Sequence, residues 1–153
     1  MNIRNKIVEI AEKEVGYIEQ IGNKTKYGKW FGMDGVPWCG MFVSWVYAKA
    51  GYPLPKIGFT KGFAGCQAAY EYFKKKGMIT KDQKPGDIVL FDFNGDGRFD
   101  HTGIFTSKNH ITALEKFPCI EGNTSDKNQN NGGQVMKKNR GFDGVIFVNV
   151  LGN

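Results

Sequence analysis

The stretch VPWCGMFVSWVY, residues 36–47, combines a helix-start signal with an almost continuous apolar run. Pro37 suits the first turn of a helix, because its φ is already helical and no backbone donor is needed there. Apolar side chains then occupy nearly every face, and Gly51 and Pro53 end the pattern. A helix that is apolar all round must be buried. The stretch therefore predicts a central helix with Cys39 in its first turn.

Two more helices are expected in the N-terminal half. Apolar residues three or four apart, with charges between them, predict an amphipathic helix over residues 3–15. Downstream of the central helix, Thr60 can cap a third helix over residues 61–76, which Gly77 would end. The Gly-rich segment 21–35 predicts a structured surface loop.

After Lys84 the apolar spacing changes to that of short strands. Gly, Asn and Lys-rich turns separate the segments, and residues 123–133 are polar enough for a hairpin loop. Helices followed by strands predict an α+β fold with an antiparallel sheet, in a single domain over residues 1–153. The expected strands are PGDIVLFDF (85–93), HTGIFTS (101–107), HITALEKF (110–117), CIEGN (119–123), QVMKKN (134–139) and GVIFVNV (144–150).

Composition narrows the function classes. With 41% hydrophobic residues the chain is not disordered, and no apolar run is long enough to predict stable membrane insertion. Charges interrupt the N-terminal apolar residues, so no signal peptide is expected and synthesis would be cytoplasmic. The net charge of +6 fits an anionic partner such as a wall polymer, or simple solubility. Scattered lysines without a recognition helix argue against nucleic acid.

Three cysteines are an odd number, which favours free thiols over a disulfide framework. A thiolate at a helix N-terminus is stabilised by the helix dipole, so Cys39 is a candidate nucleophile. The alternative is a structural cysteine, since free Cys is among the most buried residue types. Cys66, placed in the middle of the third helix, and Cys119, placed on a strand, both favour that structural interpretation.

A reactive thiol needs a base, and the sequence contains two histidines. His101 opens a predicted strand, where it can face a helix packed on the sheet, whereas His110 falls at a turn and is simpler to explain as a surface residue. A base in turn needs a group that orients its ring. Glu121 and Asn123 are two apart on a predicted strand, so both would point into one cleft beside His101. Taken alone, Glu121 could equally be an ordinary surface residue and Asn123 an ordinary turn residue.

Three segments together resemble the CHAP domain, the cysteine, histidine-dependent amidohydrolase/peptidase family. They are WCGMFVSWVY (38–47), KPGDIVLFDFNGDGRFDHTGIF (84–105) and IEGNTS (120–125). The resemblance covers nearly the whole chain and implies a papain-like α+β fold that cleaves amide bonds in peptidoglycan.

The resemblance also implies roles for four residues: Cys39 as nucleophile, His101 as general base, Glu121 as ring orienter and Asn123 as a supporting polar group. It indicates a lytic enzyme of the phage-endolysin type that acts on the bacterial wall. The lack of a signal-peptide pattern fits a lysin made in the host cytoplasm, or a catalytic module cut from a larger secreted protein. We expect a monomer that needs no cofactor for the chemistry. The bond, either muramoyl–alanine or a peptide bond, stays open. Two alternatives also stay open: a thiol hydrolase acting on proteins, and a non-catalytic wall-binding module.

The turn DFNGDGRFD offers a second site. Oxygens at alternate positions followed by Gly97 match the first part of an EF-hand calcium loop. Gly103 stands where such a loop needs its bidentate Glu, so a complete EF-hand is excluded. The sequence permits either a partial, structural calcium loop or an ordinary Asp/Asn/Gly turn. The alternate positions are Asp92, Asn94, Asp96, Arg98 and Asp100.

Overall fold

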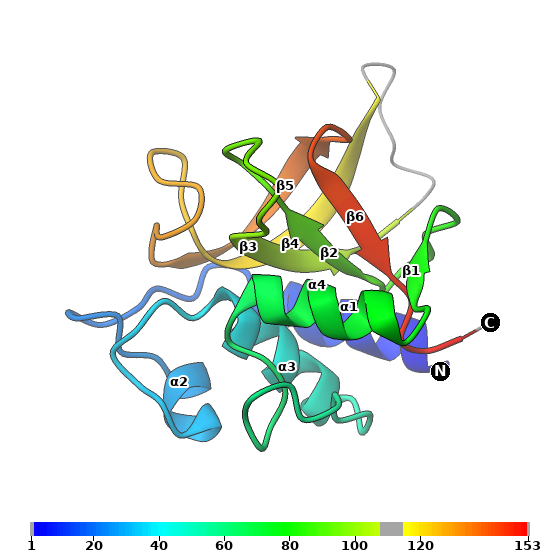
Figure 1. The fold of residues 1–153 in the computed structure, drawn as a ribbon. Coiled ribbons are helices and arrows are strands. Elements are labelled where there is room, and N and C mark those ends of the chain that lie inside the picture. Colours follow the sequence, from blue (N-terminus) through cyan, green and yellow to red (C-terminus); the bar gives the residue numbers. More distant parts are fainter. Residues whose placement is uncertain (1, 108–114, 153) are drawn as a thin grey trace.

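The computed structural model describes residues 2–107 and 115–152. Helices α1, α3 and α4 lie together on one side of a six-stranded antiparallel sheet with the order β1-β6-β2-β3-β4-β5 (Figure 1). No helix within the described residues is long and apolar enough to cross a membrane. The elements are α1 (Ile3–Glu14), α2 (Lys26–Phe31), α3 (Cys39–Lys49), α4 (Cys66–Lys75), β1 (Ile79–Thr80), β2 (Ile88–Phe91), β3 (His101–Phe105), β4 (Lys116–Thr124), β5 (Gln134–Gly141) and β6 (Val145–Val148).

The predicted α+β class is confirmed, but two helices begin later than expected. Helix α3 starts at Cys39 with Trp38 as its N-cap, so Pro37 lies outside the helix. Helix α4 starts at Cys66 after Gly65, and Thr60 does not cap it. Segment 61–64 is therefore not helical. The correction moves Cys66 from a helix middle to a helix start.

Part of the predicted surface loop is helical. Thr25 caps α2 by accepting a hydrogen bond from the Gly28 N–H at 2.9 Å, which satisfies one of the free donors at a helix start. Strand β1 was not predicted, because two residues are too few to show a period. Most of the strand expected over 110–117 lies outside the described residues, and so does His110.

Strand alternation gives the sheet two buried faces. One face joins the large core around α3, with Ile88, Leu90, Ile104 and Ile120 from the central strands. The other face carries a smaller, mainly aromatic cluster of Val89, Phe91, Phe105, Phe117, Cys119 and Phe147. His101 is four residues from Phe105 on β3, and Glu121 is two residues from Cys119 on β4, so each lies on the same face of the sheet as that neighbour. The two polar side chains therefore belong with the aromatic cluster.

Glycine at position 122 allows α3 to approach β4 closely. A Cβ there would lie 2.7 Å from Phe42 Cβ and 2.8 Å from Trp38 Cζ3. We expect Gly122→Ala to lower the free energy of unfolding by about 1–3 kcal/mol, as overpacked cores do. Urea unfolding measures the change. Gly141→Ala on the neighbouring strand is the matched control, because a Cβ there meets nothing within 4 Å. Equal stabilities for the two variants would contradict this packing argument.

Candidate active site

Two cysteines meet where helices α3 and α4 begin. Each is the first residue of its helix, and the Sγ atoms of Cys39 and Cys66 are 3.9 Å apart. Both thiols are free and buried. The side chain of Trp38 makes no capping hydrogen bond to the first turn of α3, so it does not occupy the backbone N–H groups at the start of that helix. The sequence analysis, which placed Cys66 in the middle of a helix, did not predict this contact between the two thiols.

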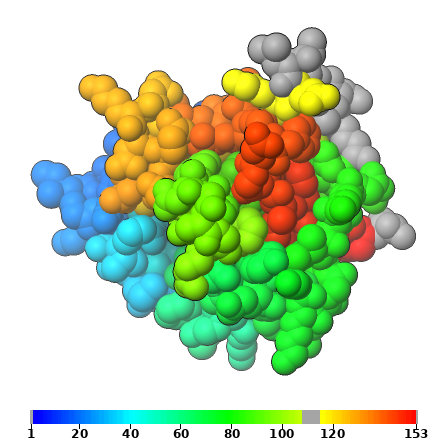
Figure 2. Space-filling view, turned by 45° about the horizontal axis from the view of Figure 1, so that its top comes forward, coloured from blue at the N-terminus to red at the C-terminus, as the bar shows by residue number. Residues whose placement is uncertain are grey.

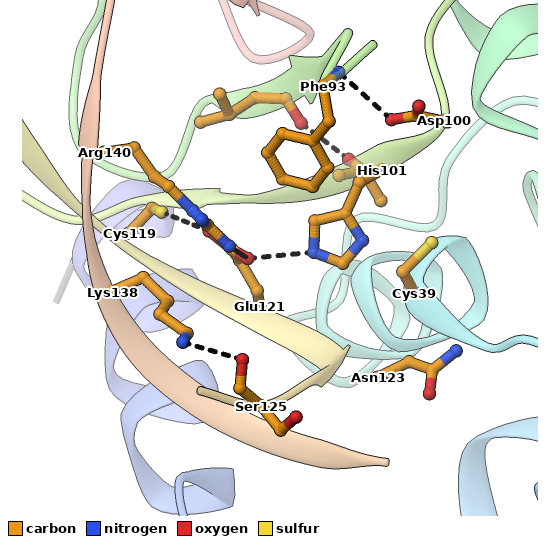
Figure 3. Close-up of polar contacts among 12 residues, drawn as sticks. Cys39, Phe93, Asp100, His101, Cys119, Glu121, Asn123, Ser125, Lys138 and Arg140 are labelled. Atoms are coloured by element: carbon orange, nitrogen blue, oxygen red, sulfur yellow. Dashed lines mark hydrogen bonds and ion pairs between the residues drawn. The ribbon is translucent and has the colours of Figure 1, made fainter. Parts of the chain in front are cut away.

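The His101 ring lies between Glu121 and Cys39 (Figure 3). Its Nε2 is 2.8 Å from Glu121 Oε1, and both side chains are fully buried. The other ring nitrogen, Nδ1, has no hydrogen-bond partner among the described residues. A buried nitrogen without a partner is costly and calls for a functional explanation. Here it faces a thiol whose proton it can accept.

The electrostatics favour a charged Cys–His pair. Hydrogen bonding from Cys66 holds the pKa of Cys39 well below its usual range, against the opposing effect of burial, and His101 and the Gly40 N–H act in the same direction. Burial disfavours the imidazolium, but the interactions of His101 with Cys39 and Glu121 outweigh it and raise the pKa of His101 to about 9. Both pKa shifts favour a thiolate and an imidazolium over a neutral pair.

Glu121 is held ionised by a residue that sequence analysis missed. Arg140 on β5 donates from Nε to Oε2 at 2.8 Å and from Nη2 to Oε1 at 2.6 Å. The Cys119 thiol adds a hydrogen bond to Oε2 at 2.9 Å. Burial raises the pKa of Glu121, but the bonds from Arg140 and His101 outweigh it and lower that pKa to about 2. Gly103 makes room, since a Cβ there would lie 2.7 Å from Glu121 Cγ.

Asn123 does not pair with His101. The regular alternation breaks between Glu121 and Thr124, where the β4–β5 register shifts, and Asn123 has a positive φ of 57°. Its side chain donates to Asn131 Oδ1 at 3.1 Å and accepts from the Gly133 N–H at 3.0 Å. The role of Asn123 as a supporting polar group of the site stays a prediction. Asn123 ties down the loop that follows β4.

The segment 92–100 protrudes at the surface beside the β4–β5 loop (Figure 2). Asp92 accepts the N–H groups of Gly95 and Gly97 at 2.9 and 2.8 Å, and Asn94 donates to Asp100 at 3.3 Å. These are the contacts of an Asp/Asn/Gly turn. The described residues contain no group of three or more His, Cys, Asp or Glu placed to hold a metal ion. The calcium loop of Asp92, Asn94, Asp96, Arg98 and Asp100 stays a prediction.

Comparison with known proteins supplies the family. A sequence model of the CHAP domain matches residues 31–123, more than half of the chain. The chain belongs to the CHAP domain family. The matched range contains Cys39, His101, Glu121 and Asn123, whereas Arg140 lies outside it. A comparison with curated proteins found no match.

Solved structures confirm the papain-like α+β fold of this CHAP domain. The crystal structure of a wild-type endolysin, LysIME-EF1, aligns with a TM-score of 0.56 and 15% identity over 97% of this chain and 63% of that one. A Staphylococcus aureus protein described as similar to a lipoprotein of the NLP/P60 family aligns with a TM-score of 0.52 and 17% identity, over 96% of this chain and 41% of that one. This chain thus spans less than two thirds of either protein.

Proposed function

We propose that this CHAP domain is a peptidoglycan hydrolase that cleaves an amide bond through a Cys39 thiolate. The observation that carries the proposal is the position of His101, with Nε2 on the Glu121 carboxylate and a free Nδ1 toward Cys39. A nucleophile, a base and a group that orients the base are the parts required for acyl transfer. Family membership and the two structural neighbours support the wall as substrate.

Each side chain then has a defined task. The Cys39 thiolate attacks the amide carbonyl, and the oxyanion accepts a hydrogen bond from the Cys39 N–H at the start of α3. The His101 imidazolium gives its proton to the leaving amine, which leaves a thioester. Neutral His101 then takes a proton from water, whose oxygen attacks the thioester; the Cys39 thiolate leaves, and the thiolate–imidazolium pair is restored. Glu121 keeps Nε2 protonated, so that Nδ1 is the nitrogen that exchanges protons with Cys39.

The finer features of the proposal concern its biology. The bond is either N-acetylmuramoyl-L-alanine or a peptide bond of the wall, and the protein acts in bacterial lysis as a phage endolysin or antimicrobial hydrolase. We further propose a monomer with one domain over residues 1–153, which needs no cofactor for the chemistry. The net charge of +6 would favour binding to anionic wall polymers.

Purified walls provide the test. The protein is added to suspensions of several Gram-positive walls under reducing conditions, and turbidity and released soluble fragments are followed. We expect clearing with release of peptide-containing fragments. Binding to walls without any release would contradict hydrolysis and favour a non-catalytic binding module. Release of fragments only from protein substrates would favour a protein-directed thiol hydrolase.

The raised pKa of His101 predicts the alkaline limit of activity. As pH rises through about 9, the imidazolium loses its proton and can no longer protonate the leaving amine. We expect kcat/KM on a soluble muropeptide to be nearly constant around neutrality and to fall above about pH 9. Thermal unfolding at each pH separates this effect from loss of the fold. A fall centred on about 6.5, the pKa of an unperturbed histidine, would contradict the ion pair.

A further inference from the structure

Arg140 contacts both oxygens of the carboxylate that orients His101. Glu121 Oε1 is shared between His101 Nε2 and Arg140 Nη2, while Oε2 accepts from Arg140 Nε and from Cys119. The guanidinium group is therefore bidentate, a geometry that fixes the plane of a carboxylate as well as its charge. Since Oε1 serves Arg140 and His101 together, a shift of the carboxylate would move the acceptor of His101 as well.

A second path leads from Arg140 to the face of the same imidazole. The guanidinium carbon lies 4.9 Å from the centre of the Phe93 ring and 5.4 Å from that of Phe91. Phe93 in turn stacks on His101, with ring centres 5.4 Å apart and planes inclined by 29°. Figure 3 shows Phe93 over His101, with Arg140 beside Glu121. Arg140 thus restrains His101 at its edge through Glu121 and at its face through Phe93.

We propose that Arg140 is a positioning residue of the reaction centre, acting on His101 through Glu121 and Phe93. This inference rests on the proposed function of Cys39 and His101. Without Arg140, the buried Glu121 carboxylate loses two charge-assisted hydrogen bonds and its neutralising cation. An unpaired buried carboxylate takes up a proton or turns toward water. Either change weakens the His101 imidazolium, and with it the Cys39 thiolate.

Arg4 provides a matched comparison for a purely structural role. Its Nη1 is 2.7 Å from Asp87 Oδ1, the Asp87 side chain is fully buried, and the arginine side chain is 14% exposed against 15% for Arg140. Arg4 also bonds Asn149 and the Gly152 carbonyl, none of which belongs to the reaction centre. Arg4→Ala and Arg140→Ala should therefore both destabilise the fold, but only the second should alter Cys39.

The test measures the reactivity of Cys39 without a wall substrate. Iodoacetamide is added to folded wild type, Arg140→Ala and Arg4→Ala at pH 7, and alkylation of the Cys39 peptide is followed by mass spectrometry. We expect Arg140→Ala to react at least about tenfold more slowly than wild type, because Cys39 would then be mainly a thiol at this pH and only the thiolate is alkylated. Added guanidinium at a non-denaturing concentration should restore most of the rate. Arg4→Ala should react at the wild-type rate, with or without guanidinium.

A smaller fall for Arg140→Ala, a fall that guanidinium does not restore, or an equal fall for Arg4→Ala would overturn the proposal. If Arg140→Ala does not fold, Arg140→Lys is compared with Arg4→Lys, because lysine keeps the charge but cannot bind both oxygens. Arg140→Lys should then be the slower of the two, and equal rates would overturn the proposal. Failure of wild type to digest walls, with the alkylation difference intact, would remove the proposed function but not the action of Arg140 on Cys39.

Discussion

The variant Cys39→Ser is expected to fold normally and to lose at least about 10³-fold in kcat/KM on wall substrates, a loss typical for removal of a catalytic nucleophile. The serine hydroxyl is almost isosteric, so the contacts at the start of α3 persist. It does not ionise near neutrality, however, so the ion pair with His101 cannot form. Initial rates of fragment release from purified walls measure the loss, and thermal unfolding checks the fold.

The neighbouring thiol makes the control for Cys39→Ser stringent. Cys66→Ser removes a sulfur 3.9 Å away but leaves the nucleophile in place, and its hydroxyl can still donate a hydrogen bond. This variant should keep a readily measured rate. Retained activity in Cys39→Ser together with lost activity in Cys66→Ser would show that Cys66, and not Cys39, is the nucleophile. Full activity in both variants would remove the thiol mechanism.

The variant His101→Ala is expected to lose a similar factor, on the order of 10³-fold or more in kcat/KM, for two reasons. No group remains to protonate the leaving amine, and the Cys39 thiolate loses its counterion. The Glu121 carboxylate stays paired with Arg140, so the fold should survive the substitution. Alkylation of Cys39 by iodoacetamide at neutral pH should slow in parallel, because the thiolate fraction falls.

The second histidine of the sequence serves as the comparison for this variant. His110→Ala should hydrolyse walls at the wild-type rate, because the mechanism assigns it no task. Loss of activity in His110→Ala, with His101→Ala still active, would show that the base is His110 and not His101. If His101→Ala hydrolysed walls slowly but its Cys39 were alkylated at the wild-type rate, His101 would still be the acid–base group, but the Cys39–His101 ion pair would be contradicted.

The sequence was sufficient for the fold class and for three members of the site. The helical spacing of apolar residues in the first half of the chain and the strand spacing in the second half predict the fold class. The helix that begins at Cys39 is apolar on nearly every face and is therefore expected in the core. His101 was predicted from its position at the start of a strand and Glu121 from its position within one, and both residues lie in paired strands. Helix α2 was missed because its six residues are held mainly by tertiary packing and the Thr25 cap.

The remaining site contacts depend on features that no local pattern encodes. The register shift between Glu121 and Thr124 interrupts the regular strand alternation. The contacts of the Asn123 side chain with Asn131 and the Gly133 N–H could therefore not be derived from that alternation. Cys66 gained its contact with Cys39 from the late start of α4, which the helical spacing of 61–76 concealed. Arg140 pairs across the sheet with Phe117, and its bond to Glu121 becomes visible only once the β4–β5 register is known.

Mass spectrometry of a wall digest tests the central claim most directly. Purified Gram-positive peptidoglycan is incubated with wild type and with Cys39→Ser, and the soluble products are sequenced. With wild type, one kind of amide bond should be cleaved, with the mass of one water added and a new amine exposed, and these products should be missing with Cys39→Ser. The same cleaved bond in both digests, or no new amine with folded, reduced wild type, would contradict a Cys39-dependent amide hydrolase.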